Sequence, residues 1–418
     1  MNAGTDPRTV FDLPLPSPPW ADGPGGCIVG LASAIAGRFR ADRSIAGAPV
    51  DGIDGSSSVA GGLADAKAVA AIAQARHVVL VLFDGLGSRQ LDTLIPDGAV
   101  AHCRRTTLRS VFPSSTAPAI TSFSTAVFPA EHANPGWFCW SEASASVVRT
   151  LPMDVRAAPD QLVTADELWD WRAASLRFGV PVVAVQPHFI ADSTFSRHAW
   201  AGAKRVGYRG RDELIEAVDA AVRANPGGAF VWAYMPHFDS TSHERGWQSE
   251  AAADVARRLD QLFERLAGRL AASGALLLAT ADHGFVDVPA AQQLRLDDYP
   301  GIAALLERPL TGEPRVAYCQ VRPGCHETFE ALARETLGHA FDLVPSDALV
   351  QAGWFGRGVV SPRLAGRIGT HTLIGRDRHT LVDRLPGEPE PSFIGMHGGI
   401  HPDELSVPLA AACRGGPL

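Results

Sequence analysis

The sequence is poor in lysine and cysteine, and it lacks a long uninterrupted hydrophobic stretch. Lys67 and Lys204 are its only lysines, and a formal net charge of −8 disfavours binding to a nucleic-acid duplex. The six cysteines form no Cys-x-x-Cys pair, which argues against a structural zinc site and a dense disulfide framework. The sequence contains no run of about 18 consecutive apolar residues, which is the length needed to span a bilayer. We therefore expect no membrane span and no binding to a nucleic-acid duplex.

The N-terminal region also lacks the pattern of a secretory signal. Residues 1–30 are rich in Pro, Gly and Asp, and no basic stretch followed by an apolar core occurs there. With cysteines that we expect to be reduced, this predicts a cytoplasmic protein. Hydrophobic residues make up 46% of the chain and charged residues 20%, as in a globular protein. The length of 418 residues allows several domains, or one large α/β domain with insertions.

Three apolar stretches of strand length each stop at an aspartate. They are residues 78–83 before Asp84, residues 229–239 ending in Asp239, and residues 275–281 before Asp282. Continuous apolar runs of this length indicate strands buried on both faces, as in parallel sheets. Between the last two, apolar residues recur at helical spacing over 255–270, which predicts a crossover helix. We therefore predict an α/β fold with a mainly parallel central sheet flanked by helices and a smaller inserted cap.

The pattern along the chain predicts four segments. Residues 1–75 show little strand patterning and are expected to be an irregular, partly helical lead-in. Residues 76–285 carry the strand and helix patterns of the first part of an α/β core. Residues 286–390 mix short strand-like and helical runs, and we interpret them as an insertion or cap over the site. Residues 391–418 are expected to complete the core.

The aspartates that follow these strands are candidate ligands of a shared site. A single aspartate after a strand is usually a turn or helix cap. The carboxyl ends of parallel strands, however, open onto one crevice, and two of the three aspartates have a histidine nearby. Asp239 and His243 are four residues apart, so one helical turn would direct both side chains to the same ion.

A second Asp-His pair and a late histidine extend this pattern. Asp282 and His283 are adjacent, and Gly284 permits the sharp bend that both side chains need to converge. His397 lies in the sequence GMHGG, whose glycines allow the backbone to approach an ion or substrate closely. Carboxylate and imidazole ligands without cysteine suit catalytic zinc, manganese or iron. We therefore predict a catalytic metal site.

The segment 111–126, VFPSSTAPAITSFSTA, places a proline-bounded turn before a run of small residues that can begin a helix. Thr116 is expected near the N-terminus of that helix. A hydroxyl in this position is usually a helix cap. Next to metal ligands, the helix dipole and its free N–H groups would instead favour a developing alkoxide and a bound phosphate.

This set of motifs resembles the alkaline phosphatase superfamily, and within it the nucleotide pyrophosphatase/phosphodiesterase group. The resemblance implies a metal-dependent hydrolase of phosphate esters that works through a phosphothreonine intermediate, with Thr116 as nucleophile. It also implies two divalent metal ions, with zinc as the first choice and manganese or iron as alternatives. By the same resemblance, one ion is held by Asp239, His243 and His397, and the other by Asp84, Thr116, Asp282 and His283.

One departure from the group concerns the substrate pocket. The group carries an Asn that binds a phosphoryl oxygen, five residues after the His of a P-x-x-H-G motif. Counted from His132, this chain has Trp137 in that position, and Ala133 replaces the glycine. Asn134 lies nearby in sequence, so Asn134 and Trp137 are both candidate substrate-binding residues.

The substrate class therefore has alternatives. We expect a phosphodiesterase or nucleotide pyrophosphatase acting on a small-molecule phosphate ester, with a phosphomonoesterase or phosphonate hydrolase as the alternative. A metal-dependent phosphomutase would have Ser at the nucleophile position, and a catalytically dead binding module would normally have lost ligands. Sulfatases need a modified Cys or Ser followed by x-Pro-x-Arg, whereas Thr116 is followed by Ala-Pro-Ala-Ile. The sequence does not determine the oligomeric state.

Overall fold

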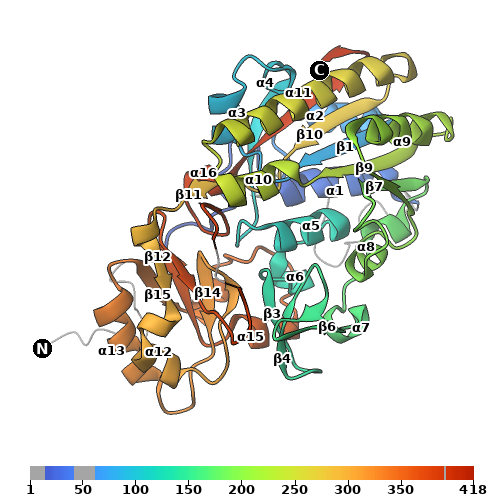
Figure 1. The fold of residues 1–418 in the computed structure, drawn as a ribbon. Coiled ribbons are helices and arrows are strands. Elements are labelled where there is room, and N and C mark those ends of the chain that lie inside the picture. Colours follow the sequence, from blue (N-terminus) through green and yellow to red (C-terminus); the bar gives the residue numbers. More distant parts are fainter. Residues whose placement is uncertain (1–14, 42–61, 390–391) are drawn as a thin grey trace, which may run out of the picture.

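In the computed structural model, residues 15–41, 62–389 and 392–418 are described, and they build two eight-stranded sheets (Figure 1). The larger body is organised around the first of these, the central sheet. Its strands, in spatial order, are β2 (Arg104–Arg109), β19 (Ser406–Cys413), β10 (Leu276–Thr280), β1 (His77–Phe83), β9 (Ala229–Met235), β7 (Val182–Pro187) and β8 (Lys204–Tyr208), with β20 (Gly416–Pro417) paired to β19.

The central sheet is mainly parallel, as the sequence predicts. Strand β1 pairs in parallel with both β10 and β9, and β7 pairs in parallel with β9 and β8. Strand β19 runs antiparallel to β10 and β2. Helix α11 (Glu250–Leu270) connects β9 to β10 and contains the crossover helix expected over 255–270. The three predicted core strands therefore lie side by side in the sheet.

Helices cover both faces of the central sheet because each central strand is apolar on both sides. All seven residues of β1 are buried. Alternate residues point to opposite faces, so Val78 and Leu80 pack in one hydrophobic cluster and Val79 and Val81 in the other. Helices on the first face include α1 (Ile28–Phe39), α2 (Ala66–Gln74), α5 (Thr116–Thr125) and α8 (Thr194–Ala199); those on the second include α3 (Ser88–Leu94), α9 (Arg211–Arg223) and α11 (Figure 1).

The second sheet is antiparallel and combines strands from two distant parts of the chain. In spatial order its strands are β15 (Phe341–Pro345), β16 (His371–Gly375), β14 (Val316–Cys319), β13 (Thr311–Glu313), β3 (Phe138–Ser141), β4 (Ser146–Arg149), β5 (Asp154–Val155) and β6 (Ala158–Leu162). Helices α12 (Pro300–Leu305) and α13 (His326–Leu337) pack on it around Phe329 and Leu373.

The expected cap, 286–390, supplies only β13 to β16 of this second sheet. Strands β3 to β6 lie between residues 138 and 162, inside the segment expected to belong to the first part of the core. The two halves join where Phe138 pairs with Gly312. Pairing between segments so far apart in sequence has no local signature. The sequence pattern therefore predicted β3 to β6 as part of the core and β13 to β16 as part of the cap. The domain boundaries themselves remain a prediction.

The remaining elements are short. They are α4 (Ala99–His102), α6 (Pro129–His132), α7 (Ala165–Leu168), α10 (His237–Arg245), α14 (Ser346–Gln351), α15 (Pro362–Ile368) and α16 (Pro402–Leu405), with the strand pairs β11 (Val286–Asp287) with β18 (Gly395–Met396) and β12 (Gln293–Arg295) with β17 (Thr380–Val382). Within the described part of the chain, no helix combines the length and apolar character needed to cross a membrane. None of the six cysteines, all of which lie in the described part of the chain, forms a disulfide.

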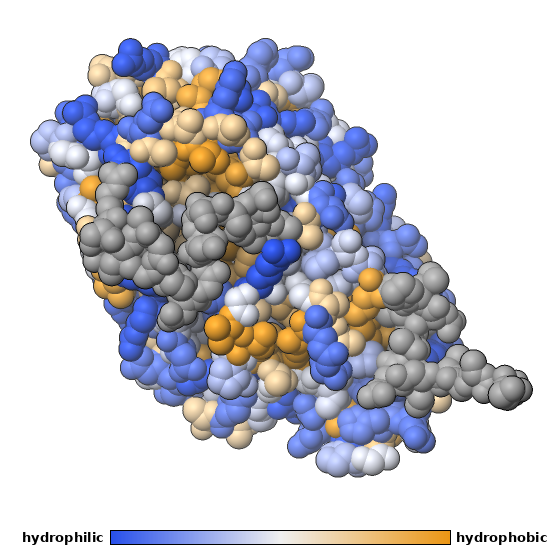
Figure 2. Space-filling model, turned by 180° about the vertical axis from the view of Figure 1, so that it is seen from behind, coloured by the Kyte–Doolittle hydropathy of each residue, from blue (hydrophilic) through white to orange (hydrophobic). Residues whose placement is uncertain are grey.

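The surface is that of a globular protein. Seen from behind, it is largely hydrophilic, with apolar residues gathered in a few areas (Figure 2). Large exposed apolar side chains such as Leu162, Phe189 and Val359 are far apart in the sequence. This distribution agrees with the class expected from the composition.

Candidate active site

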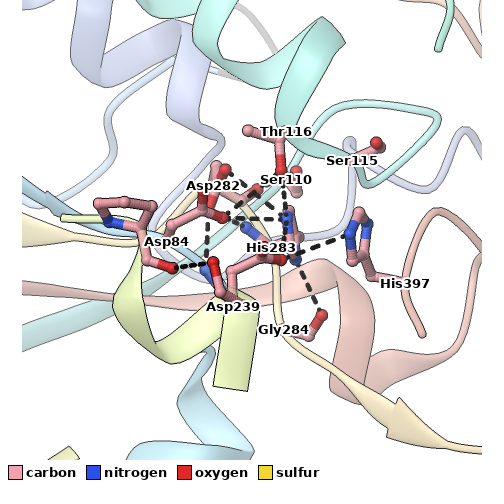
Figure 3. A network of polar contacts seen from close by, with 12 residues as sticks. Asp84, Ser110, Ser115, Thr116, Asp239, Asp282, His283, Gly284 and His397 are labelled. Atoms are coloured by element: carbon pink, nitrogen blue, oxygen red, sulfur yellow. Dashed lines mark hydrogen bonds and ion pairs between the residues drawn. The ribbon is translucent and has the colours of Figure 1, made fainter. Parts of the chain in front are cut away.

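The proposed nucleophile and metal ligands lie near one another at the carboxyl edge of the central sheet, and all of them except His243 are labelled in Figure 3. Their elements are β1, which Asp84 follows, α5, which Thr116 begins, α10, which contains Asp239 and His243, β10, which Asp282 and His283 follow, and β18, which His397 follows. One detail differs from the sequence expectation. Strand β9 ends at Met235, before Pro236, so that Asp239 lies in α10 and not at the strand end. Proline has no backbone N–H to donate to a strand partner, and this favours ending the strand there.

Asp84 is buried and held by a tyrosine. The Tyr234 hydroxyl donates to Asp84 Oδ2. The other oxygen, Oδ1, lies 3.3 Å from His283 Nε2 and 3.5 Å from Thr116 Oγ1. Burial and the nearby Asp239 charge raise the pKa of Asp84 well above its usual value, and the hydrogen bond from Tyr234 opposes this. A cation beside Oδ1 would restore the ionised form.

Asp282 is fully buried and uses one of its oxygens for backbone contacts. Oδ1 accepts hydrogen bonds of 3.1 Å from the N–H groups of Gly85 and His283. Oδ2 is buried and has no hydrogen-bond partner. Burial, followed by repulsion from Asp84, raises the pKa of Asp282 well above its usual value. A buried carboxylate oxygen with no donor is costly unless a cation lies beside it.

Two histidines have a defined orientation because backbone carbonyls bind one nitrogen of each ring. His243 Nδ1 lies 2.8 Å from the Gly395 carbonyl oxygen, and His283 Nδ1 lies 3.0 Å from that of Gly284. A carbonyl can only accept, so each Nδ1 carries a hydrogen, and in the neutral ring each Nε2 presents a lone pair. Metal-binding histidines are commonly oriented in this way.

Three imidazole Nε2 atoms, those of His243, His283 and His397, converge on one carboxylate oxygen. Asp239 Oδ1 is 3.3 Å from His243 Nε2, 3.6 Å from His397 Nε2 and 3.9 Å from His283 Nε2. It nevertheless makes no hydrogen bond although it is buried. His243 Nε2 and His397 Nε2 are 3.1 Å apart. Electron-rich nitrogens and oxygens held this close together fit a divalent cation among them.

Two overlapping ligand groups can be recognised from these distances. One contains Asp239, His283 and His397, and the other contains Asp84, Asp282 and His283, each with ligand atoms within 4.8 Å of one another. His283 therefore belongs to both groups, whereas the resemblance placed it in one. His243 also reaches Asp239 and His397, at the distances given above. The division of the ligands between two ions remains a prediction.

Thr116 is the first residue of α5, as expected. Its hydroxyl lies 3.0 Å from His283 Nε2, and the residue is only 7% exposed. The preceding residue, Ser115, is the N-cap, but its side chain does not cap the helix. It donates instead to Glu313 Oε1, at 2.5 Å. The N–H groups that the first turn of α5 offers are those of Thr116 and Ala117, since Pro118 has none. They are left without a side-chain cap, as an anion-binding helix end requires.

Glu313 and Tyr234 are site residues that the sequence reasoning missed. Glu313, at the end of β13, also accepts a 2.7 Å hydrogen bond from the Trp137 N–H. Burial raises its pKa to about 7, while hydrogen bonds from Ser115 and Trp137 oppose the shift. Glu313 lies in the second sheet and Tyr234 in the apolar run of β9, so neither had a motif that could have revealed it.

The two candidate substrate-binding residues, Asn134 and Trp137, have different surroundings. Asn134 is fully buried, and its amide nitrogen donates to the Ala117 carbonyl at 3.2 Å and to Thr121 Oγ1 at 2.9 Å. Both amide hydrogens are thus used in contacts with α5, and a substrate-binding role for Asn134 remains a prediction. Trp137 is partly buried and contacts Glu313 through its backbone. A role for its indole remains a prediction.

The loop that carries His397 is fixed by a buried ion pair. Arg315 donates to both oxygens of Glu404, at 3.0 and 2.8 Å, and both side chains are fully buried. Glu404 Oε1 also accepts from the Gly399 N–H at 2.9 Å. The Ser114 hydroxyl donates to the Gly399 carbonyl at 2.8 Å. This loop is therefore tied to the second sheet and to the turn that precedes Thr116.

A model of the type I phosphodiesterase/nucleotide pyrophosphatase family matches residues 78–399, from β1 to the loop after His397. The chain belongs to this family. Membership confirms the predicted superfamily and makes the chain a hydrolase of phosphoric ester bonds, as the sequence predicted. A search of curated protein sequences gives no match.

Several solved structures are similar to this chain. Murine ectonucleotide pyrophosphatase/phosphodiesterase 5 superposes with a TM-score of 0.61 at 15% identity, covering 82% of this chain and 88% of that one. The human counterpart gives 0.59 at 14%, covering 80% and 87%. Phosphonoacetate hydrolase from Sinorhizobium meliloti 1021, in complex with phosphonoformate, gives 0.55 at 18%, covering 82% and 91%. These likenesses confirm the predicted fold class.

Proposed function

We propose that this family member is a metal-dependent phosphodiesterase in which Thr116 is the nucleophile. The observation that carries the proposal is the convergence of three imidazole Nε2 atoms on Asp239 Oδ1, next to the Thr116 hydroxyl. Asp239 Oδ1 and Asp282 Oδ2 support it, because each is a buried carboxylate oxygen that accepts no hydrogen bond and therefore suits a bound cation.

The donor set fits two divalent ions. In this proposal Asp239, His243 and His397 hold one, and Asp84, Thr116, Asp282 and His283 hold the other. Mixed oxygen and imidazole ligands favour zinc, with manganese or iron as alternatives. When bound, such ions lower the pKa of coordinated hydroxyl groups and neutralise charge on the phosphoryl and leaving-group oxygens.

The residues of the chain supply the nucleophile and the anion-binding groups. Thr116 Oγ1 loses its proton to solvent and attacks phosphorus, and the bond from phosphorus to the leaving oxygen breaks as the phosphothreonine forms. N–H groups of the first turn of α5 hold the phosphoryl oxygens during this step. Water then attacks phosphorus, which restores Thr116 and releases the phosphate product.

A phosphonate hydrolase is the second candidate, because phosphonoacetate hydrolase is among the similar structures. A phosphomonoesterase remains the third. The phosphomutase alternative is less favoured because Thr, and not Ser, begins α5. A small-molecule ester is the expected substrate, and the lack of disulfides among the six described cysteines supports a cytoplasmic location.

A comparison of substrates tests the proposed function. Purified protein loaded with zinc or manganese is expected to hydrolyse bis-p-nitrophenyl phosphate, and more slowly p-nitrophenyl phosphate and phosphonoacetate. Release of nitrophenolate, or of inorganic phosphate for phosphonoacetate, measures each kcat/KM. Absence of turnover of all three compounds with either metal would contradict the proposal.

Tyr234→Phe is expected to weaken metal binding about 10- to 100-fold, since it removes the hydroxyl that holds Asp84 Oδ2. Zinc affinity, measured by competition with a chromogenic chelator, reports this directly and does not depend on activity.

Tyr208→Phe is the matched control for this prediction. The Tyr208 hydroxyl is also buried and donates to the Tyr234 carbonyl at 2.8 Å, but it does not contact a proposed ligand. Its loss is expected to cost stability and leave zinc affinity unchanged. Equal zinc affinities of the two variants would show that Tyr234 does not position Asp84.

A further inference from the structure

Glu313 is a buried carboxyl group next to the nucleophile that the mechanism above does not use. It is 6% exposed, and the second sheet brings it to the turn before α5. Oε1 accepts from the Ser115 hydroxyl and from the Trp137 N–H. Among the described residues, no donor binds Oε2. One carboxylate oxygen is therefore anchored and the other remains available.

Glu313 lies close to the proposed metal ligands. Its charge interacts with the imidazoles of His283 and His243. It also packs against the loop after His397, since a Cβ atom on Gly398 would lie 2.9 Å from Glu313 Cβ. A group this deeply buried is only weakly screened by solvent. Its charge therefore acts on whatever binds next to Thr116.

The net charge of the whole site indicates how the Glu313 carboxylate affects substrate binding. Asp84, Asp239 and Asp282 together offset all but one unit of the charge of two divalent ions. Glu313 offsets that last unit, so the occupied site has little positive charge left for its substrate. A phosphodiester carries one negative charge, whereas a monoester or a phosphonate carries about two at neutral to alkaline pH. Each additional negative charge is repelled by Glu313.

We propose that Glu313 is a specificity-determining residue that makes the site select singly charged phosphodiesters over doubly charged monoesters and phosphonates. This inference rests on the proposed function and specifies its substrate class. Glu313 does so through its position beside Ser115 and Trp137, which keeps its charge close to the phosphoryl group bound at the start of α5.

The test compares two esters with the same leaving group at pH 8.5, with zinc restored: methyl p-nitrophenyl phosphate and p-nitrophenyl phosphate. The wild type is expected to prefer the diester by at least about tenfold in kcat/KM. Glu313→Gln, whose amide oxygen still accepts from Ser115 and Trp137, is expected to lower this preference by about tenfold. Inorganic phosphate, measured by calorimetry, is expected to bind the variant about tenfold more tightly.

Glu327→Gln is the matched control, because it removes the same charge from an exposed position on α13 and should leave the preference unchanged. A diester preference and phosphate affinity that are the same in Glu313→Gln as in the wild type would overturn the inference. So would a wild type that prefers the monoester, a result that does not depend on the variant folding. Failure of the wild type to hydrolyse either ester would contradict the proposed function instead, and phosphate binding would still decide the role of Glu313.

Discussion

Thr116→Ala is expected to lower kcat/KM for every phosphate ester at least about 1,000-fold, a barrier increase of ~4 kcal/mol. The reason is that the hydroxyl is the proposed attacking group and lies 3.0 Å from His283 Nε2. Alanine cannot form the phosphothreonine. Because the hydroxyl is not part of the hydrophobic core, the melting temperature should change little. Initial rates on nitrophenyl esters and a thermal unfolding curve measure both effects.

Two further variants separate chemistry from packing. Thr116→Ser keeps a hydroxyl at the start of α5 and should retain much more activity than Thr116→Ala. Thr125→Ala removes a buried hydroxyl at the other end of α5, where it bonds to the Thr121 carbonyl at 2.7 Å. This control should affect stability only. Activity of Thr116→Ala within about tenfold of the wild type, a change of ~1.4 kcal/mol, would refute the assignment.

His283→Ala should have the second large effect, because His283 belongs to both groups of potential ligands. We expect bound metal to fall from about two ions per chain to fewer than one, and activity to fall with it. Elemental analysis of the purified variant measures the metal content. Chelation of the wild type should give the same loss of activity and a lower melting temperature, since ions that bind only the folded state stabilise it.

An exposed histidine provides the control for this prediction. His188→Ala changes a residue at the end of β7 that lies outside the ligand groups, and it should leave metal content unchanged. Full metal content in His283→Ala, or full activity of the chelated wild type, would contradict the proposed metal centre.

Much of the central sheet could be predicted because its strands are apolar on both faces. β1 is buried along its whole length, and a run of this kind has few alternatives to a central strand of a parallel sheet. The crossover helix α11 was predictable for a similar reason, since its buried residues recur at helical spacing. The start of α5 at Thr116 also followed from local sequence.

The clustering of the proposed ligands was predictable as a set, although their detailed arrangement was not. A parallel sheet brings its carboxyl strand ends to one edge, so residues after β1 and β10 had to lie near each other. The placement of Asp239 in α10 follows from the end of β9 before Pro236. The shared position of His283 depends on the direction of its ring, which is oriented by the contact of Nδ1 with the Gly284 carbonyl.

By itself, the sequence therefore determined the fold class, the grouping of the proposed ligands at one edge of the sheet and the place of Thr116 at the start of α5, because these depend on local patterns and on the geometry of parallel sheets. Only the tertiary structure decided which polar groups surround the nucleophile. Pairing of β3 with β13 carries Glu313 to Ser115 and Trp137 across more than a hundred residues of chain. Packing also places the amide of Asn134 in hydrogen bonds with α5. Such contacts arise from packing between distant segments, which leaves no pattern in either segment alone.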